Sequence, residues 1–256
     1  SIAPYLQSAR PDRVWILWET AAGYESRVEW GPSESLGRLA CGSSQESFFG
    51  ARVHETLLEG LYPATTYYYR VATGETVSPV HHFRTPPADD SEASFRLVAL
   101  ADSQRDLFNP DVYSDIIQDG VLGFFQDTFG ADIALELGLV LFAGDLVDNG
   151  WLYYQWPDEL FAPGAALMRH VPFYPVLGNH EANTPYYFSL FHLPDNGGPG
   201  NEERWWSTRY GNVQVIGLDS NPPFDGDPQL DWLDDQLAVA CADETIDFVF
   251  AELHHP

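Results

Sequence analysis

The sequence predicts a β-sandwich domain followed by a layered α/β domain. Up to about residue 85, short β-prone runs alternate with turn residues, at the spacing typical of a small sandwich. Beyond that point, strand-like runs alternate with segments of helical length and periodicity, which indicates sheets covered by helices. A chain of 256 residues has room for two domains of this kind.

Four runs predict the strands of the first domain. They cover residues 14–18, 27–30, 54–58 and 66–71. All are rich in β-branched and aromatic side chains, which favour strands. Residues 86–92 contain two prolines followed by acidic and small residues, a composition typical of a linker. We therefore predict a first domain over residues 1–87 and a second over residues 95–256.

The second domain is predicted to alternate strands with helices. Its predicted strands are residues 95–100, 139–142, 173–177, 205–210, 213–218 and 248–251. Its predicted helices are residues 112–129, 152–168 and 230–240. In the last helix Leu230, Leu233, Leu237 and Cys241 recur at steps of three and four residues, as on one face of a helix. Four aromatic residues either line a substrate cleft or pack in the core: Trp151, Tyr153, Tyr154 and Trp156.

The composition excludes several functions. The formal net charge is −26, and the sequence contains no lysine, so it has no Schiff-base lysine, no Walker-type phosphate loop and no lysine general base. A chain this acidic does not bind nucleic acid through a basic surface. No stretch is apolar enough to span a membrane. For Cys41 and Cys241 we expect two unpaired, buried thiols, with an interdomain disulfide as the alternative.

Four polar clusters stand directly after predicted strands of the second domain. The ends of parallel strands share one edge of an α/β sheet, where ligands bind, so we expect the clusters to meet there. Carboxylate, amide and imidazole groups together suit ions such as manganese, iron or zinc. The candidate ligands are Asp102, Gln104, Asp145, Asn179 and His254.

These residue types predict a two-metal hydrolase. Asp145 follows a buried run and a glycine, and its two oxygens can bridge two cations. Two neighbouring cations hold a phosphate and lower the pKa of a bound water to make hydroxide. His180, beside Asn179, is placed to donate a proton to the leaving oxygen. We therefore expect a metal-dependent phosphoesterase that uses a metal-activated hydroxide.

The clusters also resemble the signature of the calcineurin-like metallophosphoesterases, in particular their purple acid phosphatase-like branch. Residues 144–148 (Gly-Asp-Leu-Val-Asp) and 178–181 (Gly-Asn-His-Glu) match two motifs of this family in full and in order. Residues 58–70 and 82–86 resemble the fibronectin type III-like domain that precedes the catalytic domain in purple acid phosphatases. The resemblance covers nearly the whole chain and implies a metallophosphoesterase fold for the α/β domain.

The resemblance also implies a role for each site residue. Asp145 would bridge two transition-metal ions, which would be iron, manganese or zinc. Asp102 would bind the first ion, and Asn179 and His254 the second. His180 would donate a proton or stabilise the transition state without binding metal. The family's Gly-His-x-His motif does not occur before Pro256, so we expect a catalytic domain that lacks its C-terminal part here and continues in the native chain.

Two positions depart from the family pattern. Gln104 stands where many members have histidine, and its amide oxygen either ligates a hard cation or orients a water. Asp148 stands where purple acid phosphatases have the tyrosine that gives them their colour, and an aspartate cannot supply that charge-transfer band.

The expected substrate is a small phosphate ester, and the sequence leaves open whether it is a monoester, a diester or a nucleotide. By resemblance alone, we expect the protein to be secreted, into the periplasm or the extracellular space. The rival hypothesis is a non-catalytic surface or matrix protein that retains this fold. Nothing in the sequence predicts an oligomeric state.

Overall fold

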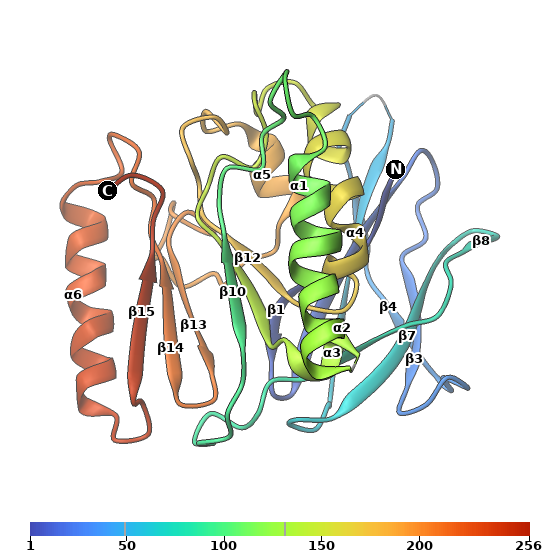
Figure 1. Ribbon diagram of the computed structural model, residues 1–256, viewed down its shortest axis with the longest axis horizontal. Helices are drawn as coiled ribbons and strands as arrows, with labels where there is room; N and C mark the ends of the chain where they lie inside the picture. Colours follow the sequence, from blue (N-terminus) through green and yellow to red (C-terminus); the bar gives the residue numbers. More distant parts are fainter. Residues whose placement is uncertain (49, 131) are drawn as a thin grey trace.

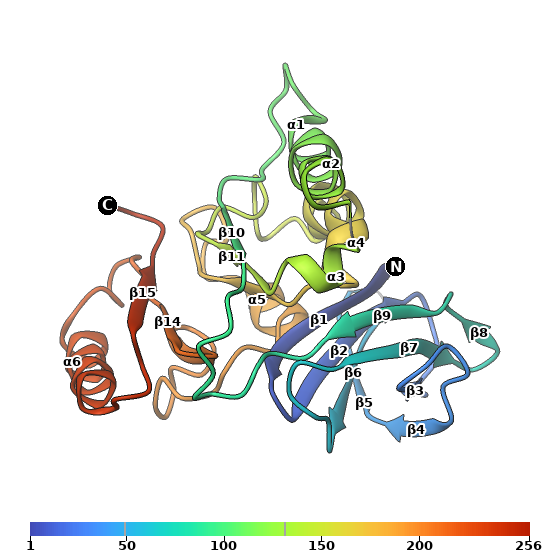
Figure 2. The ribbon, with the colours of Figure 1, turned by 60° about the horizontal axis from the view of Figure 1, so that its bottom comes forward.

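Two antiparallel sheets form the first third of the chain. A computed structural model describes residues 1–48, 50–130 and 132–256. One sheet has the strand order β1-β2-β6-β5, and the other has the order β4-β3-β7-β8 with β9 paired to β7 (Figures 1 and 2). The strands are β1 (Ile2–Arg10), β2 (Arg13–Thr20), β3 (Arg27–Gly31), β4 (Arg38–Cys41), β5 (Ser43–Glu46), β6 (Arg52–Glu59), β7 (Thr66–Thr73), β8 (Thr76–Val77) and β9 (His81–Arg84). The predicted N-terminal β domain is thus confirmed.

Strand β2 is buried on both faces. Val14, Ile16 and Trp18 pack between the two sheets, in one cluster with Val28. The alternate residue Leu17 belongs to the core of the second domain. Because side chains alternate between the faces of a strand, an unbroken apolar run is typical of a strand that is covered on both sides. The β domain is therefore packed firmly against the rest of the chain.

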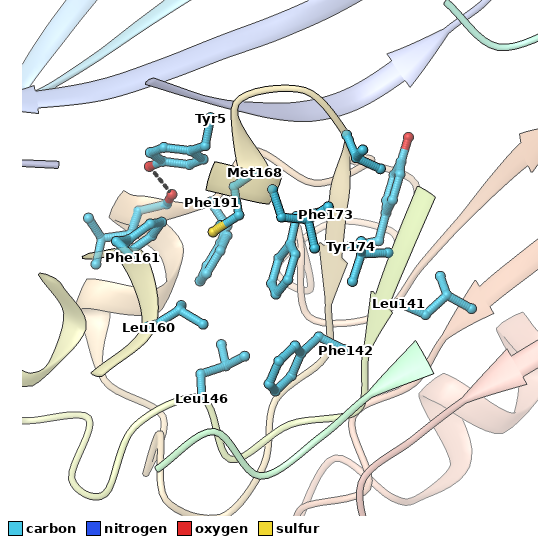
Figure 3. Packing of buried hydrophobic residues seen from close by; sticks show 14 of the residues in the cluster. Tyr5, Leu141, Phe142, Leu146, Leu160, Phe161, Met168, Phe173, Tyr174 and Phe191 are labelled. Carbon is cyan, nitrogen blue, oxygen red and sulfur yellow. Dashed lines mark hydrogen bonds between the residues drawn. The ribbon is translucent and has the colours of Figure 1, made fainter. Parts of the chain in front are cut away.

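Strand β1 carries much of this contact. The ring centroids of Tyr5 and Phe161 lie 4.8 Å apart, and the Tyr5 hydroxyl donates to the carbonyl of Leu190 (Figure 3). Nε2 of Gln7 donates to the carbonyl of Phe173 at 2.6 Å. The sequence pattern does not predict β1, because Pro4 and buried polar residues interrupt its apolar run.

The first domain holds the predicted linker in place. The Arg10 guanidinium pairs with the Asp89 carboxylate at 2.7 Å, and the carbonyl of Pro86 accepts from the backbone N–H of Ala64 at 2.9 Å. Pro86 and Pro87 are buried. The connection between the domains is therefore ordered along its first half.

The second domain contains two three-stranded sheets. The first sheet consists of the parallel strands β10 (Leu97–Leu100), β11 (Leu139–Phe142) and β12 (Phe173–Pro175). The second sheet consists of β13 (Trp206–Tyr210), β14 (Val213–Gly217) and β15 (Phe248–Glu252). In it β13 runs antiparallel and β15 parallel to β14. Each of the six strands overlaps a predicted one, which confirms the alternating pattern.

Helices accompany both sheets (Figures 1 and 2). The predicted helix over residues 112–129 is confirmed as one continuous run of α1 (Val112–Asp115), the π-helix η1 (Ile116–Gly123) and α2 (Phe124–Phe129). The second predicted helix begins later, with η2 (Trp156–Phe161), and continues as α4 (Ala162–Met168). The others are α3 (Ile133–Glu136), α5 (Pro185–Leu190) and α6 (Asp227–Ala242). Within the described parts of the chain, none of the helices combines the length and apolar character needed to cross a bilayer.

Helix α6 and the cysteines depart from expectation. On α6, Leu230 and Leu237 are exposed, whereas Gln229 and Ala240 are the buried residues. Cys41 and Cys241 are unpaired, as expected, but both are exposed. The expectation of buried thiols is wrong because Cys41 ends the edge strand β4 and Cys241 lies on the solvent side of α6.

The predicted aromatic set divides between core and surface. Tyr153 and Trp156 are buried in the core of the second domain. Trp151 and Tyr154 are exposed, at 57% and 58%. Only the buried pair therefore serves as packing.

Candidate metal centre

Three loops leave the same edge of the first sheet and carry Asp102, Asp145 and Asn179. Two backbone hydrogen bonds join the first loop to the second. The N–H of Asp102 donates to the carbonyl of Gly144 at 3.1 Å, and the N–H of Ser103 donates to the backbone carbonyl of Asp145 at 3.0 Å. The strand register explains this meeting, since Leu100 lies opposite Phe142 at the ends of β10 and β11. Three of the four predicted clusters thus meet at one sheet edge. The fourth, which contains His254, follows β15 and comes from the second sheet.

Two glycines allow the loops to approach so closely. A Cβ atom on Gly144 would lie 2.7 Å from the backbone nitrogen of Gly178 and 2.9 Å from Cβ of His254. A Cβ atom on Gly178 would lie 2.2 Å from Oδ1 of Asp145. Any larger residue would therefore have to displace a loop. This steric requirement accounts for the glycine that precedes Asp145 and the one that precedes Asn179.

Two of the candidate ligands adopt a left-handed backbone conformation. The φ angle is 58° at Asp102 and 53° at Asp145. Residues other than glycine adopt this region at a cost, although aspartate tolerates it better than most. Such strain is typical of functional sites whose surroundings hold the side chain in one direction.

Glu181 fastens the second loop to the third. Its carboxylate accepts from the backbone N–H groups of Asp145 at 3.0 Å, Leu146 at 2.7 Å and Gly178 at 2.7 Å. The side chain is fully buried, and this burial raises the pKa of Glu181 to about 7. Glu181 therefore orients the backbone of both loops.

Carboxylate, amide and imidazole atoms meet where the two sheets face each other. Asp102, Asp145 and His254 each offer one ligand atom, all within 4.8 Å of one another. Nε2 of His254 lies 3.3 Å from Oδ2 of Asp145 and 3.2 Å from Oδ1 of Asn179. Atoms that share one ion at roughly 2.1 Å lie at most about 4.2 Å apart, and the two separations from Nε2 of His254 fall inside that limit, so they suit a metal.

The tautomer of His254 supports a cation at this point. Nδ1 lies 2.8 Å from the carbonyl oxygen of Ala143, which can only accept, so Nδ1 carries the proton. In the neutral ring Nε2 then presents its lone pair to the oxygens of Asp145 and Asn179, which also present lone pairs. A cation among them removes this conflict, and metal-binding histidines usually donate their other N–H to a carbonyl in this way. The residues therefore fit a metal ion.

Gln104 lies differently from the other candidates. It lines a small cavity together with Tyr113 and Glu159. Its Oε1 atom is buried and has no hydrogen-bond partner among the described residues, and the same holds for the Tyr113 hydroxyl. The two candidate roles of Gln104, metal ligand and water-orienting group, stay predictions.

His180 reaches the centre from the third loop. Its backbone N–H donates to Oδ1 of Asp145 at 3.0 Å. Its ring Nδ1 donates to the carbonyl of Asp148 at 2.6 Å, which leaves Nε2 3.7 Å from Oδ2 of Asp145. The ring is therefore fixed beside the candidate ligands with one nitrogen free for chemistry.

His255, which the sequence leaves open between a supporting position beside the centre and a solvent-facing one, also reaches the centre. Its Nε2 lies 3.2 Å from Oδ1 of Asn179, and Oγ of Ser220 contacts both its Nδ1 and its backbone nitrogen at 2.9 Å. Ser220 follows β14, the neighbour of β15. The position of Ser220 after a strand that pairs with β15 is the signal that could have found its contact with His255.

The comparisons with known proteins agree with this architecture. Residues 2–85 match the family model of the purple acid phosphatase N-terminal domain, and residues 95–256 match that of the calcineurin-like phosphoesterases. The solved structure of purple acid phosphatase PPD1 from yellow lupin (Lupinus luteus) has a TM-score of 0.75 at 20% identity. The likeness covers 98% of this chain and 50% of the lupin chain, and it shows a shared fold.

Two curated relatives carry phosphatase names. Phosphoenolpyruvate phosphatase of Allium cepa is 24% identical over 75% of this chain, and purple acid phosphatase 15 of Arabidopsis thaliana is 26% identical over 73%. The chain spans 40% and 38% of the lengths of these two proteins. Since the phosphoesterase family model matches well over half of the residues, the chain belongs to the calcineurin-like phosphoesterase family.

Proposed function

We propose that this protein hydrolyses phosphate esters at a metal centre held by Asp102, Asp145, Asn179 and His254. The observation that carries the proposal is the meeting of His254 Nε2 with the oxygens of Asp145 and Asn179, at 3.3 and 3.2 Å. Divalent or trivalent ions bound at such a site neutralise phosphate charge and lower the pKa of water. Family membership supports the same reaction class.

The chain itself holds two of these ligands, Asp145 and His254, in place. Oδ1 of Asp145 accepts from the backbone of His180, which leaves Oδ2 directed at His254. The carbonyl of Ala143 holds the ring of His254 in a single tautomer. Ligands that are held in this way lose little conformational freedom on binding, which raises affinity for the metal and for the phosphate that it holds.

His180 is the proton donor in this proposal. Because its Nδ1–H is committed to the carbonyl of Asp148, Nε2 carries a proton only in the imidazolium form. Delivery of that proton to the leaving oxygen returns the neutral ring, with Nδ1 still protonated and the orientation unchanged. The ring is about one-third exposed, so solvent can restore the proton.

Metal content tests the centre. The full-length native protein, reconstituted with Mn²⁺ or Zn²⁺, is expected to retain transition-metal ions and to hydrolyse p-nitrophenyl phosphate. Asp145→Asn should lose both properties, while Asp111→Asn, an exposed position before α1, should keep them. A reconstituted protein with neither metal nor activity would overturn the proposal in favour of a non-catalytic protein with this fold.

Leaving-group dependence tests His180. We expect His180→Ala to lower turnover of alkyl phosphates by roughly 10²–10⁴-fold, with a much smaller loss for nitrophenyl phosphate, whose leaving group needs little protonation. Metal content should stay nearly unchanged. An equal loss for both substrates would instead assign His180 to stabilisation of the phosphoryl oxygens.

A further inference from the structure

A pocket opens directly beside the candidate metal centre. Its volume is about 380 Å³, within the usual range for small-molecule sites. Its lining includes Asn179, which also belongs to the metal centre, together with Leu177, Asn183, Arg204, Asn221 and Phe224. A phosphate ester whose phosphate lies at the centre would therefore have this pocket next to it.

Arg204 is the cation of this pocket, and its charge is already compensated. Its guanidinium donates to Oδ2 of Asp219 at 2.9 Å and to Oδ1 of Asn183. Asp219 is fully buried and Arg204 is 11% exposed. A second anionic group on a substrate would therefore have to compete with an ion pair that is already formed, in a chain whose net charge is −26.

The remaining surface suits a neutral, flat group. The guanidinium carbon of Arg204 lies 3.7 Å from the centroid of the Phe224 ring, so a planar stack forms part of the wall. Pro222 and Pro223 add exposed apolar surface. Nδ2 of Asn183 and Oδ1 of Asn221 make no hydrogen bond within the described residues, while the opposite end of each amide is bonded. One donor and one acceptor are thus left for a ligand.

We infer that this pocket binds the organic group of the substrate and selects a neutral aromatic or heteroaromatic group. The inference rests on the proposed function, since it places the phosphate at the metal centre. Phosphate esters of a flat, uncharged ring should bind better than simple alkyl phosphates. Substrates with further phosphate groups should gain nothing here, because Arg204 is already paired.

Hydrolysis-resistant phosphonates test the inference by calorimetry on the protein loaded with Mn²⁺. We expect phenylphosphonate to bind roughly tenfold more tightly than methylphosphonate, as an aromatic contact and its buried area imply. Phe224→Ala should bring the two affinities together by weakening phenylphosphonate alone. Phe224→Leu keeps the bulk and should retain an intermediate preference, and Leu107→Ala, an exposed residue outside the pocket, should change nothing.

The outcomes separate the two proposals. Equal binding of both phosphonates to the unmodified protein would overturn the pocket assignment and leave the phosphoesterase proposal standing. A preference for phenylphosphonate that survives in Phe224→Ala would also overturn it. Binding of neither phosphonate would overturn the metal-centre proposal and, with it, the pocket assignment.

Discussion

The two sheets of the second domain hold the candidate centre in different ways. In the first sheet all four residues of β11 are buried, and backbone and carboxylate hydrogen bonds tie its three loops together. In the second sheet Phe248, Val249 and Phe250 of β15 are exposed, and His254 reaches the first sheet through one ring hydrogen bond. The first sheet thus supplies a rigid half-site, and the second supplies ligands whose position depends on how the sheets align.

The largest expected effect is at Glu181. Glu181→Ala would leave the N–H groups of Asp145, Leu146 and Gly178 without an acceptor in the core. Each such loss costs roughly 1–3 kcal/mol, so we expect unfolding free energy to fall by about 4 kcal/mol. Urea denaturation measures this loss of unfolding free energy, and Glu244→Ala, at an exposed position, is the control. A loss no larger than that of the control would show that the first sheet is not rigid in the way described.

His254 should affect metal affinity more than stability. His254→Ala removes a ligand and the bond to Ala143, so affinity for Zn²⁺ should fall by at least roughly 100-fold. The side chain lies at the margin of the core, so the midpoint of urea unfolding should move little. Competition with a chelator measures the affinity. Unchanged affinity would place the centre on the first sheet alone.

The segment that leads into the second sheet should make stability depend on pH. Burial raises the pKa of Glu203 from 4.5 to about 8, and the N–H of Leu193 donates to its carboxylate. Because the unfolded chain releases this proton first as pH rises, the contribution of Glu203 to stability falls between about pH 4.5 and 8. In the unmodified protein, ionisation of Glu203 should lower the free energy of unfolding by about 2 kcal/mol between pH 5 and 7. We expect Glu203→Gln to abolish this fall.

The control for this measurement is an exposed glutamate elsewhere in the second domain. Glu244 is exposed in the loop after α6, so Glu244→Gln should leave the pH profile of unfolding as it is. Identical profiles for the unmodified protein and Glu203→Gln would mean that Glu203 ionises normally.

The smallest effect is expected on β15. Phe250 is 47% exposed, so Phe250→Ser should change unfolding free energy by no more than about 0.5 kcal/mol. Light scattering should show less self-association, because an exposed apolar edge strand pairs readily with other chains. A large destabilisation would show that β15 is packed as firmly as β11.

The elements that follow local rules were predictable from the sequence. Strand β11 is a short apolar run bounded by glycines, and the motifs after β11 and β12 stand where strands end, so both the sheet and the convergence of loops could be foreseen. The contact between His255 and Asn179 could not, because it depends on how the two sheets face each other. Strand β1 was hidden for a similar reason, since its partners lie far along the chain.

Other predictions stay untested. They include the domain limits at residues 87 and 95, the roles of the individual site residues and secretion from the cytoplasm.

Burial depends on what each element packs against, and sequence periodicity does not specify the partner. The exposed Leu230 and Leu237 of α6 illustrate this point, as does the buried Gln229, which donates to the carbonyl of Asp219 at 2.9 Å.

The left-handed backbone at Asp102 and Asp145 lowers the stability of the fold, while the carboxylates at these positions serve the candidate centre. An aspartate in this conformation costs on the order of 1 kcal/mol relative to glycine, so Asp102→Gly should fold at least as well while it removes a carboxylate from the centre. Without selection for the reaction, substitutions of these aspartates by glycine would accumulate, because the fold tolerates them. Lineages that no longer needed the reaction would be expected to lose these aspartates early, and to gain stability as they did so.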